Sequence, residues 1–195
     1  MHRSKRLAPF LITALSLLTI LACTIPSLIG GGDSPAGTTE EIAETLELNG
    51  ATIDDVSAIS SDDTIGPVLS LQITNPGSGE VVATLPCGLV FHPGQGIEEQ
   101  SLMLIQQIVI DIPPGESVVV QPYEVCIESN MDVPSTGSAY QVGEITSGDL
   151  LKFARCLCRQ DLPESITSSP TAFQDLFGIQ IAVWAVADDI SFDDL

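Results

Sequence analysis

The sequence predicts a mainly β fold: an immunoglobulin-like antiparallel β-sandwich followed by two C-terminal helices, an α+β arrangement. Apolar, partly alternating segments between residues 68 and 127 are separated by proline and glycine turns, with no helical crossover between them. That pattern disfavours a parallel sheet. After residue 147 the apolar residues take helical spacing. A length of 195 residues suits one domain with a small helical addition.

The expected strands are bounded by turn chemistry. Asn75-Pro76-Gly77 closes the first strand, and Pro113-Pro114-Gly115 closes the third. Pro86 and Pro122 interrupt the second and fourth, because proline cannot donate a ladder hydrogen bond. We expect strands at 68–73, 80–91, 102–112, 117–127 and 140–145.

Helical patterns lie at both ends of the folded part. The segment 38–46 either starts with a short helix capped by Thr38 or is an extended lead-in to a strand. Near the C-terminus, 147–159 has one apolar face, and 174–187 forms a second helical pattern after a loop rich in serine and proline.

The N-terminus predicts export. Arg3, Lys5 and Arg6 precede an apolar run at 7–22, the arrangement of a secretory signal. The run is shorter than the roughly 20 residues that a membrane-spanning helix needs. We therefore expect residues 1–22 to be a signal peptide and the mature protein to be extracytoplasmic.

Ile20-Leu21-Ala22-Cys23 resembles a bacterial lipobox. The resemblance implies cleavage before Cys23 and a covalent diacylglycerol on its sulfur; no other cofactor is expected. Residues 23–45, with Gly30-Gly31-Gly32, then form a flexible tether, and 46–195 form the β-sandwich with its helical segment. The membrane would be a partner through this lipid anchor.

Composition excludes some classes of function. Six Lys and Arg against 26 Asp and Glu give a formal net charge of −20, which excludes a nucleic-acid partner. No nucleophile elbow, phosphate-binding glycine loop or zinc signature appears in the sequence. We expect a protein that is not an enzyme: a membrane-tethered, noncatalytic binding or envelope-interaction module, whose protein or envelope ligand the sequence does not identify.

Four cysteines follow Cys23: Cys87, Cys126, Cys156 and Cys158. In an oxidising compartment an even number predicts two disulfides. Cys156 and Cys158 point in different directions on a helix, so we expect Cys158 to pair with Cys87 or Cys126. Zinc bound by these cysteines and His92 is the alternative, but their spacing is irregular; we expect no metal site, and His92 in a loop.

The segment Gln180-Ile181-Ala182-Val183-Trp184 looks like the Gln-x-Ala-aliphatic-Trp motif of bacterial surface thioester domains, and Cys126-Ile127 resembles their cysteine motif. The resemblance implies a bond between the Cys126 sulfur and the Gln180 carbonyl, shielded by Trp184. A surface adhesin that attaches covalently is therefore the alternative function. Otherwise Cys126 lies in a disulfide, Gln180 decorates a helix and Trp184 fills the core.

Overall fold

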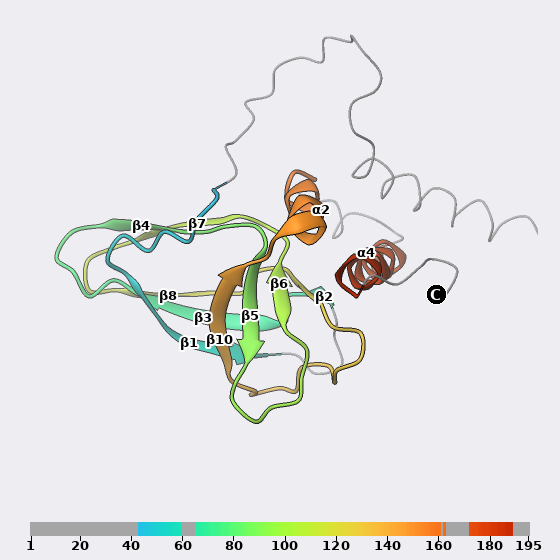
Figure 1. Ribbon diagram of the computed structural model, residues 1–195. Coiled ribbons are helices and arrows are strands. Elements are labelled where there is room, and N and C mark those ends of the chain that lie inside the picture. Colours follow the sequence, from blue (N-terminus) through green and yellow to red (C-terminus); the bar gives the residue numbers. More distant parts are fainter. Residues whose placement is uncertain (1–42, 60–64, 161, 163–171, 189–195) are drawn as a thin grey trace, which may run out of the picture.

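The computed structural model describes residues 43–59, 65–160, 162 and 172–188 (Figure 1). The predicted signal peptide, Cys23 and the tether as far as residue 42 lie outside the described residues. The described part is mainly β, with antiparallel sheets and the helices α2 (Gly148–Cys158) and α4 (Ala172–Ala187). The prediction of a mainly β, sandwich-like α+β fold is confirmed at this level.

One sheet has three strands in the order β1-β3-β8. In β3 every second side chain, Leu69, Leu71 and Ile73, is fully buried, as period-2 alternation requires. These strands are β1 (Thr52–Ala58), β3 (Leu69–Thr74) and β8 (Ser117–Val120).

A second sheet has five strands in the order β10-β5-β6-β9-β2 and is buried on both faces around β6 and β9. Leu102 and Cys126 contribute to the core shared with the other strands, whereas Met103 and Val125 contribute to a separate core under the helices. Its strands are β2 (Ile65–Gly66), β5 (Leu89–Pro93), β6 (Leu102–Leu104), β9 (Glu124–Cys126) and β10 (Tyr140–Ile145).

Three expected strands each prove to be two, because the chain passes from one sheet to another within them. Pro86 separates β4 from β5, and Pro122 separates β8 from β9, so both proline interruptions are confirmed. The third break, between β6 and β7, follows Ile105 and contains no proline. The remaining strands, β4 (Val81–Leu85) and β7 (Ile108–Ile112), form a two-stranded ribbon.

The helices lie next to each other beside the five-stranded sheet (Figure 1). Helix α4 contacts β9 and β2 as well as α2. Because α4 is apolar on most of its surface, it buries Ile179, Ala182 and Val183 against this sheet. The helix therefore reaches the sheet at the end of β9.

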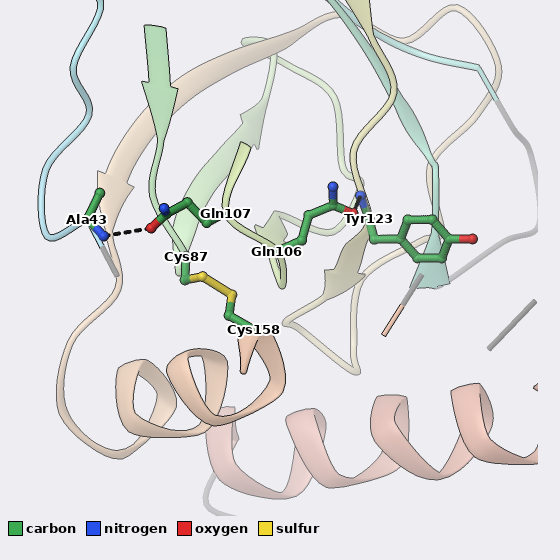
Figure 2. Close-up of a disulfide and its surroundings, with 6 residues drawn as sticks. All are labelled: Ala43, Cys87, Gln106, Gln107, Tyr123 and Cys158. Atoms are coloured by element: carbon green, nitrogen blue, oxygen red, sulfur yellow. Dashed lines mark hydrogen bonds between the residues drawn. A yellow bond between two sulfur atoms is a disulfide. The ribbon is translucent and has the colours of Figure 1, made fainter. Parts of the chain in front are cut away.

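The described beginning of the chain, residues 43–50, is irregular and runs beside β4 and β7. Glu47 pairs with Thr84 by an antiparallel bridge, and the Ala43 backbone N–H donates to Gln107 Oε1 at 2.6 Å (Figure 2). Of the segment 38–46, the structure describes only residues 43–46, which are not helical; Thr38 and the rest of the expected helix lie outside the described residues.

Candidate functional site

The site lies at the edge of the five-stranded sheet, at the end of β9. The two residues of β2 pair with Val125 and Glu124 and extend no further along β9. The backbone N–H and C=O of Cys126 on this side are thus left without a strand partner, although Cys126 is fully buried. Buried backbone groups need a substitute partner.

Gln180 from α4 supplies that partner. Its Oε1 accepts a hydrogen bond from the Cys126 backbone N–H at 3.1 Å, and its Nε2 donates to the Cys126 carbonyl at 2.7 Å. We call this pair of bonds the Gln180 clamp. The amide carbon of Gln180 is one bond from each of these two side-chain atoms, so it lies within about 4.4 Å of the Cys126 backbone. Two residues 54 positions apart are thereby held together in a site that is 0% exposed.

Trp184 lies one helical turn after Gln180. Its Nε1–H donates to the Oε1 of Gln100 at 3.2 Å, and its half-buried ring packs against the core shared by the sheets. At the end of the same helix, Asp188 accepts a hydrogen bond from the Ser129 backbone at 3.0 Å. The helix is therefore held at three successive points, to Cys126 at the end of β9, to Gln100 before β6 and to Ser129 after β9.

Cys126 is a free, buried thiol, so the expectation that it forms a disulfide is wrong. Burial raises its pKa to about 12, and the nearby carboxylates of Glu128 and Glu124 contribute to the same shift. At neutral pH the sulfur is therefore protonated.

The disulfide lies between Cys87 and Cys158, one of the two pairings expected for Cys158 (Figure 2). It joins the turn between β4 and β5 to the last residue of α2, with a Cα–Cα distance of 6.4 Å. As expected, Cys156 and Cys158 are not paired with each other.

His92 belongs to β5 and not to a loop, which corrects the sequence expectation. Its Nδ1 shares a hydrogen bond with Ser101 Oγ at 3.0 Å, and its Nε2 lies 3.2 Å from Glu144 Oε2. The hydrogen bond from His92 lowers the pKa of the exposed Glu144 carboxyl. Among the described residues no group of three or more His, Cys, Asp or Glu side chains is arranged to hold a metal ion.

Sequence reasoning missed Glu124. This carboxyl group is 0% exposed on β9, and its Oε2 accepts hydrogen bonds from the backbone N–H groups of Val68 at 3.1 Å and Leu69 at 3.4 Å. Its Oε1 is buried and has no hydrogen-bond partner among the described residues. An acidic residue next to Val125 and Cys126 in an otherwise apolar strand was the available signal.

Comparisons with protein-family models, with curated proteins and with solved structures found no match to this chain. Cys23, the expected lipidation site, lies outside the described residues. No helix within the described part of the chain has the length and apolar character needed to cross a membrane.

Proposed function

We propose that this chain is an exported, lipid-anchored surface protein that attaches covalently to an amine-bearing partner through an internal thioester between Cys126 and Gln180. One observation carries the proposal: the Gln180 clamp holds an amide carbon within about 4.4 Å of the backbone of Cys126, a cysteine whose buried thiol has no disulfide. The resemblance of Gln180-Ile181-Ala182-Val183-Trp184 and Cys126-Ile127 to the motifs of surface thioester domains supports it. We infer separately, from the strand pattern, that the β-sandwich is immunoglobulin-like.

The proposed bond forms without any change of oxidation state. The Cys126 sulfur adds to the Gln180 amide carbon, the carbon–nitrogen bond breaks, and the nitrogen leaves as ammonia with the thiol hydrogen. Burial of both residues excludes the water that would otherwise hydrolyse the product. A partner amine then attacks the thioester carbon, a new amide forms, and Cys126 regains its thiol.

A noncatalytic binding or envelope-interaction module is the second candidate. The Gln180 clamp supports it too, because its two hydrogen bonds also complete the open edge of β9 without any reaction. Under this proposal the same lipid tether at Cys23 holds a domain that binds its ligand without a covalent bond.

Intact mass under nonreducing conditions separates the two candidates. A thioester lowers the mass of the purified mature protein by one ammonia, and treatment with methylamine then adds one methylamine. Cys126→Ala and Gln180→Ala should abolish both changes. Gln106→Ala is the matched control, because Gln106 also accepts a backbone hydrogen bond, from Tyr123 at 3.0 Å, but holds no cysteine. A wild-type mass explained by disulfides alone would refute the thioester and favour the noncovalent module.

The lipid anchor has its own test. Cys23→Ser should lose retention in the membrane fraction, because several buried acyl methylenes contribute about 0.8 kcal/mol each to the anchoring. A sulfur that carries a lipid thioether cannot also form a disulfide. A peptide that links Cys23 to another cysteine, or unchanged membrane retention of the variant, would contradict lipidation.

A further inference from the structure

Glu124 and Cys126 face the same compartment of the protein. They are two positions apart on β9, and alternate residues of a strand point to one face. Their partners on β6, Leu104 and Leu102, both belong to the core shared by the sheets, as does Cys126. The Glu124 carboxyl group therefore lies on the same face of β9 as the Cys126 thiol, and both residues are 0% exposed.

The hydrogen bonds of Glu124 indicate which oxygen carries a proton. Oε2 accepts from two backbone N–H groups, so it acts as the carbonyl-like oxygen. Oε1 has no partner in the described part of the chain. Burial raises the pKa of Glu124 well above its ordinary value, and none of the described ion pairs includes it. A neutral carboxyl group with its O–H on Oε1 is the form that this environment favours.

We propose that Glu124 is the proton-transfer group that forms the thioester between Cys126 and Gln180. This inference rests on the proposed function. As the sulfur adds to the amide carbon, a carboxyl oxygen of Glu124 takes the thiol proton, and the Oε1–H proton passes to the amide nitrogen. The carbon–nitrogen bond then breaks, ammonia leaves, and Glu124 ends neutral, as it began.

The reaction needs such a group for two reasons. The Cys126 thiol is protonated at neutral pH, because burial raises its pKa to about 12. An amide nitrogen also leaves far more readily once it is protonated. A neutral carboxyl group can accept one proton and donate another in the same step, in a site from which water is excluded.

The step can be measured on folded protein. Ammonia opens the thioester and regenerates both the Cys126 thiol and the Gln180 amide, which is the starting state. After transfer to ammonia-free buffer, re-formation appears in the intact mass as renewed loss of one ammonia. The measurement therefore does not depend on refolding.

Glu124→Gln is the decisive variant. Its side chain has the same shape and keeps an oxygen to accept the Val68 and Leu69 hydrogen bonds, so a structural role predicts a wild-type rate. Loss of proton transfer predicts re-formation slower by about 10²-fold or more. Glu128→Gln is the matched control, because Glu128 also lies two positions from Cys126, on its C-terminal side. Both of its carboxylate oxygens already accept hydrogen bonds from Ser101. The thioester of this variant should re-form at the wild-type rate.

Wild-type protein gives a second measurement that holds even if Glu124→Gln does not fold. Among the described residues, two further titratable groups interact electrostatically with Cys126: Glu128, which follows β9, and Tyr140 on β10. If a thiolate reacts unaided, the rate rises about tenfold per pH unit below the thiol pKa. If neutral Glu124 transfers the protons, the rate stays level and then falls as Glu124 ionises.

The outcomes separate the two proposals. A wild-type protein that never loses ammonia refutes the proposed function, and this inference with it. A wild-type thioester that re-forms equally fast in Glu124→Gln, or whose rate rises with pH as for a free thiolate, overturns the role of Glu124 alone.

Discussion

Removal of the Cys87–Cys158 disulfide should cost a large part of the stability of the domain. The bond closes a loop of 71 residues between the start of β5 and the end of α2. The chain-entropy relation gives about 4.4 kcal/mol for a loop of this length. We expect Cys87→Ala/Cys158→Ala to lose about 2–4 kcal/mol of unfolding free energy.

Urea unfolding followed by circular dichroism measures this loss, and thermal unfolding should show a midpoint lower by roughly 5–15 °C. Met103→Leu is the control, because it removes a fully buried sulfur but no crosslink and should cost less than about 1.5 kcal/mol. A double variant that loses no more than this control would refute the reasoning that the disulfide restrains the unfolded chain.

The remaining predictions concern buried polar groups. Asn75→Ala should lower the unfolding free energy by about 2–4 kcal/mol in urea titrations. The reason is that the Asn75 side chain donates to Gly79 O at 2.8 Å and accepts from the Gly77 N–H at 2.9 Å. A loss under about 1 kcal/mol would contradict this. Tyr140→Phe should lower it by about 1–2 kcal/mol, since the hydroxyl donates toward a buried carboxylate at 3.2 Å and a carbonyl at 3.1 Å; an unchanged thermal midpoint would contradict this. Because the pKa of Glu124 is raised in the folded protein, the folded state binds a proton that the unfolded state releases. The stability that this proton contributes is complete below about pH 4.5, the ordinary pKa, and is lost as pH rises through the raised pKa. Unfolding titrations from pH 5 to 8 should therefore show a fall in wild type that is smaller in Glu124→Gln, and parallel curves would exclude a buried neutral Glu124.

The fold class followed from the sequence because it depends on local signals. Alternation in β3 and the interruptions at Pro86 and Pro122 are properties of short segments, and the structure confirms them. Strand β1 was missed because only Val56 and Ala58 are buried there and two aspartates break its apolar pattern. The change of sheet after Ile105 has no local marker, since it depends on which strand lies next to which in the folded protein.

The candidate site was foreseeable only in part. The motif around Gln180 and the cysteine at 126 predicted two residues that the structure does bring together. The free state of Cys126 did not follow, because an even number of cysteines favours complete pairing until the actual partners are known. Nor did the burial of Glu124, since only the tertiary fold places this side chain where desolvation raises its pKa.

The geometry of the Gln180 clamp also bears on whether the proposed attachment can be reversed. Cys126 presents its N–H and C=O on one side of the strand, so the Gln180 amide must meet both groups with one edge. Of the two hydrogens on Nε2, the clamp therefore uses the one that is cis to Oε1 across the carbon–nitrogen bond. In the secondary amide formed with a partner amine, the favoured trans form places the partner's carbon cis to Oε1, where the clamp needs a hydrogen, and places the remaining N–H trans to Oε1. The cis form costs about 2.5 kcal/mol or more. Hydrolysis instead leaves a carboxylate that cannot donate to the Cys126 carbonyl. Only ammonia restores the starting amide, so attachment to an amine would leave the edge of β9 open and the reacted site unable to reset itself.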